Sequence, residues 1–438
     1  MKKTLLTVAK FGGSSLSSAT QFKKVKKIVE SSDTRNVIVV SAVGRVNPKD
    51  SKITDLLYLL YAHLEYSVPY DDLFDMIKNR YLKIKEELQL NLDIEKSFND
   101  LKKELNNNID VDYLVSRGEY FSAKLMSEYL GYEFIDAKEL IAFHYNGKIN
   151  MEKTKENIGK VYASHKHIVV PGFYGSYSNK KVHLMSRGGS DITGAIIARS
   201  LNVNIYENWT DVSGILMADP KIIKNPKQIK EITYDELREM SYMGAKVLHE
   251  ETIIPVQELN IPINILNTNI PENPGTLILE KCNDTSQIIT GITGKKSFMA
   301  FTINEVSGTN KTALLSKVLD IFDKFGVVVE YVPGSIDSFS IIVSYDKVKS
   351  VMYDIISEIK QNDQIKSIDV DDDMALVAVI GRNMVTRAGI SGRIFGLIGN
   401  NNINIKMISQ GAVEFAIIFG VSNSDFKKTI KVLYDNLV

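Results

Sequence analysis

The first residues that could do chemistry lie near the N-terminus, in residues 10–15, which read KFGGSS. Adjacent glycines carry no side chains, so their backbone N–H groups can approach a phosphate closely. Lys10 would supply a mobile cation for the oxygens of a phosphoryl group in transfer. The run is neither a Walker loop nor a dinucleotide fingerprint, because GxxxxGK[ST] and GxGxxG are both absent. It predicts an anion-binding turn, although a plain strand-to-helix turn explains it equally well.

A second group of donors lies in residues 186–193, which read SRGGSDIT. Arg187 offers a planar fork suited to a carboxylate, and the residues after it expose N–H and hydroxyl donors at a predicted helix start. Two anion-friendly helix starts in one domain predict a polyanionic ligand and an anionic co-substrate. Residues 208–214 (NWTDVSG), followed by Asp219, end a further apolar strand. Taken alone, this third run could be an ordinary capped turn.

The elements that must position these residues are short apolar runs alternating with helical patterns. The runs are residues 5–8, 37–40, 168–170, 203–206 and 263–266. They are continuous in Val, Ile and Leu, as parallel strands covered on both faces by helices tend to be. After the first run, Phe22, Val25 and Ile28 have helical spacing behind capping candidates Ser17, Ser18 and Thr20. We therefore predict an α/β domain with a mostly parallel sheet sandwiched by helices. Residues 67–108 show helical spacing without strand signals and predict a helical insertion.

The C-terminal part of the chain contains an internal repeat, in which residues 314–344 match residues 390–420 without a gap. The apolar pairs are Leu314 with Ile390, Val318 with Ile394, Phe322 with Ile398, Val327 with Ile403, Val329 with Ile405, Phe339 with Phe415, and Ile341 with Ile417. Each copy predicts a helix followed by two strands, the centre of a βαββαβ unit. Any two segments made of a helix and a hairpin could also give such a match.

Bulk composition excludes several classes of protein. The 438 residues predict two or three domains, and 53 basic residues balance 53 acidic ones, which gives no sign of nucleic-acid binding. No run approaches the ~20 apolar residues that span a bilayer. With Cys282 the single cysteine, no intramolecular disulfide can form, and we expect a cytoplasmic protein. The histidines show no metal-ligand spacing, so no metal site built from protein ligands is predicted.

Five motifs in order resemble the aspartate kinase family, within the amino-acid kinase superfamily, from Lys10 almost to the C-terminus. They are KFGGSS (10–15), SRGE (116–119), SRGGSD (186–191), WTDVSG (209–214) and GAKVLH (244–249). The resemblance implies transfer of the ATP γ-phosphoryl group to the β-carboxylate of L-aspartate, giving 4-phospho-L-aspartate. This is the first step of lysine, threonine and methionine biosynthesis. A carboxylate nucleophile is already ionised at neutral pH, so the chemistry needs positioning and charge neutralisation but no general base.

The resemblance also implies roles for single residues. Catalysis falls to Lys10, Asp191 and Lys246. Aspartate is held by Thr54, Glu119, Arg187 and Ser190. ATP is bound by Lys10, Gly12, Gly13, Ser14, Thr210, Asp211, Asp219 and Lys246, with Mg²⁺ held mainly by phosphate and water. Without the resemblance, Glu119 could simply open an amphipathic helix, and Lys246 could be a solvated helix lysine. The chain departs from the family pattern at Ser14, Leu216 and Glu250.

The repeated tail resembles paired ACT domains, the amino-acid-binding modules of this family. The implied division is a catalytic domain over residues 1–285, with its insertion at 67–108, and a regulatory region over 286–438. The first ACT unit spans about 299–368 and is nested in the second, made of 286–298 plus 369–438. Lysine, threonine or both are the expected inhibitors, and ACT pairing implies a dimer or a dimer of dimers. The expected effector residues are Val306, Ser307, Ser335, Asp337 and Ser338.

Two other functions stay open from the sequence. A different amino-acid kinase, acting on glutamate or acetylglutamate, would need a different substrate cage and would not require SRGE or paired ACT units. An amino-acid sensor with a degenerate kinase domain would be expected to lack Lys10, Asp191 or Arg187, and all three are present.

Overall fold

The computed structural model describes residues 5–47, 49–186, 188–245, 248, 250–282, 288–382, 384, 387–411 and 415–438. The chain forms two compact units. The first comprises Met1–Ile215, Lys230–Tyr234 and Val247–Cys282, and the second comprises Leu216–Ile229, Asp235–Lys246 and Asn283–Val438. Two segments inside the predicted catalytic domain therefore belong to the second unit. The predicted boundary at 285/286 lies outside the described residues, and the division into domains stays a prediction.

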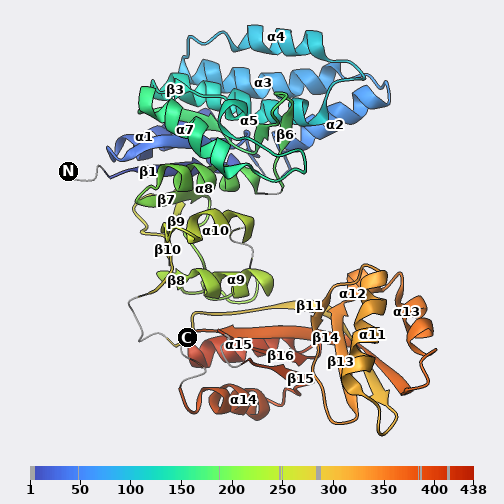
Figure 1. Cartoon of the computed structure of the whole chain (residues 1–438). Coiled ribbons are helices and arrows are strands. Elements are labelled where there is room, and N and C mark those ends of the chain that lie inside the picture. Colours follow the sequence, from blue (N-terminus) through green and yellow to red (C-terminus); the bar gives the residue numbers. More distant parts are fainter. Residues whose placement is uncertain are drawn as a thin grey trace. The chain divides into compact units, whose positions relative to one another are not determined.

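An eight-stranded sheet forms the centre of the first unit (Figure 1). Its strands, in spatial order, are β3 (Glu133–Phe134), β4 (Ile168–Pro171), β2 (Arg35–Val40), β1 (Thr7–Phe11), β7 (Ile205–Thr210), β9 (Ile263–Asn267), β10 (Thr276–Leu279) and β8 (Glu231–Thr233). All neighbours pair in parallel except β9 and β10. The predicted mostly parallel sheet is confirmed, with β1 and β7 each beginning two residues later than expected. All five residues of β1 are buried, as expected for a strand covered on both faces.

Helices surround this sheet. They are α1 (Ala19–Glu30), α2 (Ile53–Glu65), α3 (Asp71–Leu88), α4 (Ile94–Glu104), α5 (Val111–Leu130), α6 (Ala137–Leu140), α7 (Met151–Ser164), α8 (Gly189–Leu201) and α10 (Glu250–Gln257). Ser18 caps α1 and accepts a hydrogen bond from the Gln21 N–H. Residues 67–108 contain α3 and α4, which lie beside α2 and α5 (Figure 1). Phe74, Tyr81 and Phe98 belong to the hydrophobic core of this region. A short hairpin, β5 (Tyr174–Ser176) and β6 (Val182–Leu184), completes the unit.

The second unit contains a six-stranded sheet. Its order is β12 (Val329–Tyr331), β13 (Ser338–Ser344), β11 (Gly291–Glu305), β14 (Ile365–Ile380), β16 (Ala416–Val421) and β15 (Met407–Ser409). Its helices are α9 (Tyr234–Tyr242), α11 (Lys311–Lys324), α12 (Tyr345–Val348), α13 (Met352–Ile359), α14 (Ile390–Asn400) and α15 (Phe426–Leu437). All neighbours in this sheet pair antiparallel, and the order of helices and strands along the chain fits the predicted βαββαβ units.

The tail repeat corresponds to two separate hydrophobic cores. Leu314, Val318 and Phe322 of α11 lie in one core, and their repeat partners Ile394 and Ile398 of α14 lie in the other. The long strands β11 and β14 contribute to both cores. Ile292 of β11 and Val377 of β14 lie in the α14 core, whereas Phe301 of β11 and the partly buried Ile368 of β14 lie in the α11 core. Each copy of the sequence repeat therefore forms its own hydrophobic core, and the two cores share the long strands β11 and β14.

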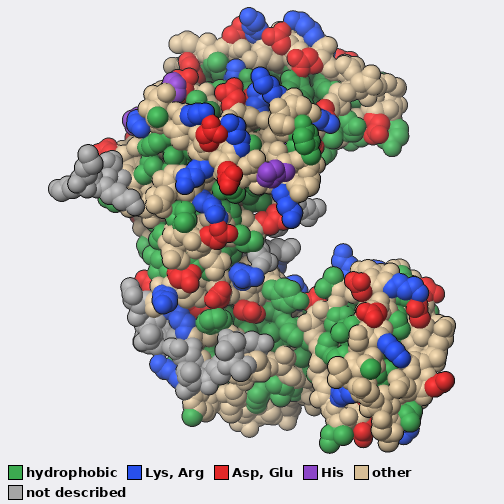
Figure 2. Space-filling view, viewed as in Figure 1, with side chains coloured by type: hydrophobic (Ala, Val, Ile, Leu, Met, Phe, Trp, Pro, Cys, Tyr) green, Lys and Arg blue, Asp and Glu red, His purple; other side chains and the backbone are tan. Residues whose placement is uncertain are grey.

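Side chains of both charges are interspersed on the face shown in Figure 2. This mixture agrees with the balance of acidic and basic residues in the sequence. Across the described residues, no helix combines the length and apolar character needed to cross a membrane.

Candidate active site

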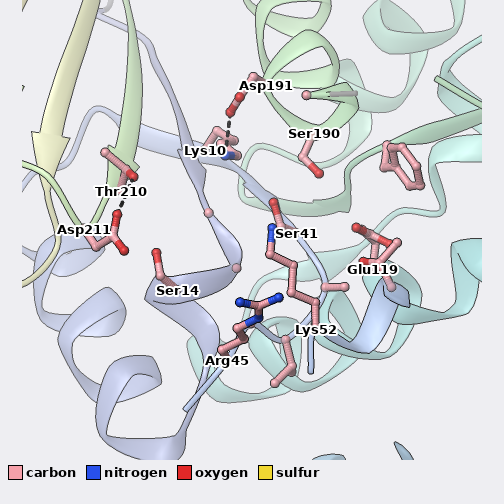
Figure 3. A pocket seen from close by; sticks show the side chains of 18 of the residues that line it. Lys10, Ser14, Ser41, Arg45, Lys52, Glu119, Ser190, Asp191, Thr210 and Asp211 are labelled. Carbon is pink, nitrogen blue, oxygen red and sulfur yellow. Dashed lines mark hydrogen bonds and ion pairs between the residues drawn. The ribbon is translucent and has the colours of Figure 1, made fainter. Parts of the chain in front are cut away.

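A buried ion pair lies where β1 meets the start of α8. The Lys10 Nζ is 2.5 Å from Asp191 Oδ1, and Lys10 is only 7% exposed. The Asn208 side-chain amide on β7 also donates to Asp191 Oδ1, at 3.1 Å. Because β1 and β7 are parallel neighbours with Lys10 opposite Asn208, the sheet register itself assembles this trio. The structure thus brings together two of the three predicted catalytic residues (Figure 3).

The glycines after β1 lie against strand β7 and against the loop that follows β2. Gly12 N–H donates to the Trp209 carbonyl at 2.9 Å, and Gly44 N–H donates to the Gly13 carbonyl at 2.9 Å. A Cβ at Gly44 would lie 2.4 Å from the Gly13 carbonyl, so only glycine fits there. One expectation is corrected. The glycines lead into a short 3₁₀ helix, Gly13–Leu16, and α1 begins only at Ala19, so the first turn of α1 does not contain the glycine cradle.

Glu119 lies in the middle of α5 and is 4% exposed. The reading in which this residue opens a helix is therefore wrong. Its Oε2 has no hydrogen-bond partner among the described residues. Burial raises the pKa of Glu119 to about 8, against smaller lowering effects from backbone hydrogen bonds and from Lys10. A buried carboxylate with an unused oxygen suits a cationic group of a ligand.

A single cavity of about 660 Å³ joins these features. Ten predicted site residues line it, namely Lys10, Gly12, Gly13, Ser14, Thr54, Glu119, Ser190, Asp191, Thr210 and Asp211. They come from β1 and the turn after it, from α2, α5 and α8, and from the end of β7. Figure 3 labels Lys10, Ser14, Glu119, Ser190, Asp191, Thr210 and Asp211. The cavity is lined by Lys10 and the glycine cradle as well as by Glu119. Transfer of a phosphoryl group from a polyanion to an amino acid would require both kinds of group.

Three predicted residues are not placed in this cavity. Arg187 and Lys246 lie outside the described residues. Asp219 belongs to the second compact unit, where its carboxylate accepts a hydrogen bond from the Lys221 N–H at 2.8 Å, and it is not among the lining residues.

Sequence reasoning missed several lining residues. Ser41, Arg45 and Lys52 come from the loop between β2 and α2, and Phe173 follows β4. The position of this loop in the sequence could have identified these residues. The loop follows the carboxyl end of a parallel strand, where ligands of open α/β sheets bind. The loop has no paired glycines to mark it.

A buried network behind the cavity was also missed. Arg35 donates to both carboxylate oxygens of Glu207, at 2.7 and 3.1 Å, and the Trp209 indole N–H donates to the same carboxylate at 2.8 Å. Trp209 also stacks on Phe11, with ring centroids 5.9 Å apart. These contacts hold β7, whose end carries Thr210 and Asp211, against β1.

The predicted effector residues lie in the second unit at the turns after β11 and before β13. The Glu305 N–H donates to the Asp337 carbonyl at 2.9 Å, and the Ser335 N–H donates to the Ser338 carbonyl at 2.8 Å. Sequence reasoning missed Lys311, whose ammonium donates to the Ser335 carbonyl and, at 2.9 Å, to the Ser338 carbonyl. The turn that carries three of the expected effector residues therefore binds an ammonium group from the chain itself.

The chain is similar to known proteins along its whole length. Residues 6–267 match the amino acid kinase family, and residues 377–437 match an ACT domain. The chain is 33% identical to aspartokinase 3 of Bacillus subtilis over 98% of both chains. It is 26% identical to the lysine-sensitive aspartokinase 3 of Escherichia coli, which it covers to 99%.

Solved structures show the same relationship. Aspartate kinase from Clostridium acetobutylicum, described as an allosteric enzyme, superposes with a TM-score of 0.93 at 45% identity, covering 99% of this chain and all of that one. Escherichia coli aspartokinase III in complex with lysine and aspartate gives a TM-score of 0.76 at 25% identity over 99% of both chains. The chain is therefore an ATP-dependent kinase of the amino acid kinase family and belongs, within that family, to the aspartokinases.

Proposed function

We propose that this kinase transfers the γ-phosphoryl group of ATP to the β-carboxylate of L-aspartate and releases 4-phospho-L-aspartate and ADP. The observation that carries the proposal is one cavity with the Lys10–Asp191 pair beside a glycine cradle at one end and the buried Glu119 at the other. Glu119 matches an α-ammonium, and the opposite end matches phosphate. The names of the relatives support aspartate as the amino acid.

The chemical step needs no proton transfer. A β-carboxylate oxygen attacks the γ-phosphorus, the bond from that phosphorus to the bridging oxygen breaks, and ADP leaves with the electron pair. Lys10 neutralises charge on the phosphoryl oxygens, while Asp191 and Asn208 hold its ammonium in place. We assign the nucleotide phosphates to Gly12 and Gly13.

The remaining roles follow from the residues that share the cavity. Ser14 adds a hydroxyl to the cradle, and Thr210 and Asp211 lie at the nucleotide side, where β7 ends. Thr54 and Ser190 complete the polar cage around aspartate, with Arg187 on its α-carboxylate. Lys246 and Asp219 are proposed for the nucleotide.

Mg²⁺ would enter with ATP. Within the described residues, no group of three or more His, Cys, Asp or Glu side chains could hold a metal ion. Phosphate oxygens and water would therefore supply most of its ligands, with Asp211 the exposed carboxylate of the cavity. The ion would supply charge neutralisation between the β- and γ-phosphates.

We further propose that lysine, threonine or both inhibit the enzyme by binding to its ACT units. The enzyme would act in the cytoplasm as a homodimer or a dimer of dimers. The reaction would then be the first step toward lysine by way of diaminopimelate, and toward threonine and methionine. The proposal is supported by the ACT match and by the lysine complex of the Escherichia coli relative.

The test is ADP release by the full chain with ATP and Mg²⁺, offered L-aspartate, L-glutamate or acetylglutamate, with and without lysine and threonine. We expect turnover on aspartate alone, suppression by at least one effector, and a loss of at least about 10³-fold in kcat for Lys10→Met. Turnover on glutamate or acetylglutamate would identify a different amino-acid kinase. Effector binding without any turnover would identify a sensor.

A further inference from the structure

The loop between β2 and α2 forms part of the cavity wall beside the glycine cradle. Gly44 packs directly on Gly13, and the Ile53 N–H donates to the Val43 carbonyl at 3.4 Å, which closes the loop at its base. Any side chain that this loop directs into the cavity is therefore next to the proposed phosphate site.

A side chain of the helical insertion holds this loop in place. Arg80 of α3 donates to the Ser51 carbonyl at 2.6 Å and forms an ion pair with Asp50, and its side chain is 16% exposed. Asp50 in turn accepts a hydrogen bond from the Val46 N–H at 3.2 Å. The loop is thus fixed at its middle as well as at its base, and the residue after Ser51 is Lys52.

Two cations of the loop line the cavity, and they differ in their partners. Arg45 lies 3.9 Å from Asp55, and both side chains are about half exposed, so this pair contributes little. The Lys52 side chain extends into the cavity in Figure 3, and its ammonium makes no ion pair or hydrogen bond with the described residues. Lys10, in contrast, is already paired with Asp191. Lys52 is therefore the cavity lysine whose charge is uncommitted within the described part of the chain.

We propose that Lys52 is a further catalytic cation, which binds the oxygens of the phosphoryl group as that group moves from ATP to the acceptor carboxylate. Lys52 comes from the loop that packs on the cradle at Gly13, and it precedes Thr54 on the amino-acid side, so it lies at the junction of the two subsites. Charge develops on the transferred group there, and a positioned cation stabilises it. The identity of the acceptor carboxylate rests on the proposed function. The contact between Lys52 and the γ-phosphate does not.

The first experiment measures nucleotide affinity in the full chain, with Mg²⁺, for ADP and for the non-hydrolysable triphosphate adenylyl imidodiphosphate. If Lys52 contacts the γ-phosphate, Lys52→Met should weaken binding of the triphosphate about tenfold and change the affinity for ADP by less than about twofold. Lys49→Met is the matched control, because Lys49 is an exposed lysine on the same loop that does not line the cavity. It should change neither affinity.

The second experiment measures turnover with aspartate. We expect Lys52→Met to lower kcat on the order of a hundredfold, Lys52→Arg to recover part of it, and Lys49→Met to leave it unchanged. Equal effects of Lys52→Met on both nucleotides, or none, would overturn the inference. A change confined to the KM for aspartate would also overturn it, by assigning Lys52 to the amino acid. If the unaltered enzyme uses no acceptor of the panel but Lys52→Met still discriminates the triphosphate, the proposed function fails and the phosphate contact stands.

Discussion

At the scale of single residues, the cavity combines a buried cation that is paired and a buried acid that is not. Lys10 has Asp191 as its counter-charge, so its burial costs little. Glu119 has no cationic partner within the described structure, and one of its oxygens makes no hydrogen bond. Burial without compensation stabilises the neutral carboxyl, whereas the proposed role of Glu119 requires the carboxylate.

The raised pKa of Glu119 predicts a pH dependence of aspartate use. Below a pH of about 8 the carboxyl of the free enzyme is protonated, and binding of an α-ammonium then requires loss of that proton. We expect kcat/KM for aspartate to rise with pH and to level off above about 8. Glu119→Gln should remove this pH-dependent limb along with most of the activity. A flat wild-type profile between pH 6 and 9 would contradict the assignment.

The same residue predicts a pH dependence of stability. The folded pKa of about 8 exceeds the ordinary value of 4.5, so the folded chain keeps a proton that the unfolded chain loses. Stability from this group is therefore fully present below pH 4.5 and is lost as pH rises through about 8. Glu119→Gln should raise the thermal unfolding midpoint relative to wild type at pH 8.5 more than at pH 6. Equal shifts at both pH values would count against it.

At the scale of elements, loops and strand ends are fixed by charged contacts that lie behind the cavity. Arg35 at the start of β2 binds Glu207 on β7 through two hydrogen bonds, and its Nη1 donates to the Ile28 carbonyl at 2.6 Å. Arg80 binds the loop that carries Lys52. These contacts place the ends of parallel strands, where the lining residues are carried.

Arg35→Met should destabilise the first unit, because it leaves the Glu207 carboxylate buried without its counter-charge. Breaking such a pair costs about 3 kcal/mol, less here to the extent that solvent reaches it. Urea unfolding would measure the loss. Lys23→Met, which removes an exposed lysine on α1, is the control and should change the free energy of unfolding by less than about 0.5 kcal/mol. Similar values for both variants would show that the network contributes little.

Arg80→Met should loosen the loop that carries Lys52 without removing a cavity residue. We expect kcat to fall about tenfold and the backbone amides of residues 45–47 and 49–52 to exchange faster with deuterium, because two contacts of the loop are lost. Lys83→Met, which removes an exposed cation from the same helix, should do neither. Lower activity without faster exchange would mean that Arg80 acts in some other way than by positioning the loop.

At the scale of the whole molecule, part of the kinase sequence is built into the second unit. Helix α9 belongs to that unit, where the fully buried Glu236 accepts hydrogen bonds from Thr290 Oγ1 at 2.5 Å and from Arg382 Nε at 3.1 Å. Residues 243–245 connect α9 to Lys246, which is proposed to reach the nucleotide. The proposed effector-binding unit is therefore joined through the chain itself to the residue proposed for the nucleotide.

Glu236→Gln should weaken this attachment of α9. We expect inhibition by lysine or threonine to become several-fold weaker, since coupling between sites is typically only about 1–3 kcal/mol, while activity without effector persists. Asp235→Asn alters an exposed acid on the same helix and should preserve the response. An unchanged inhibition constant in Glu236→Gln would show that this anchor does not carry the coupling.

The sequence by itself determined the strand-loop-helix order, the mostly parallel sheet and the tail repeat, whereas the site residues that share the cavity were implied by the family resemblance. Those features are local, because periodicity and glycine spacing report on a few neighbouring residues. Only the tertiary structure decided that Lys52 and Arg45 join the cavity, that Arg80 holds their loop, and that α9 belongs to the second unit. These facts depend on contacts such as Arg80 with Asp50 and Glu236 with Arg382, between residues far apart in the sequence. No local pattern encodes such contacts.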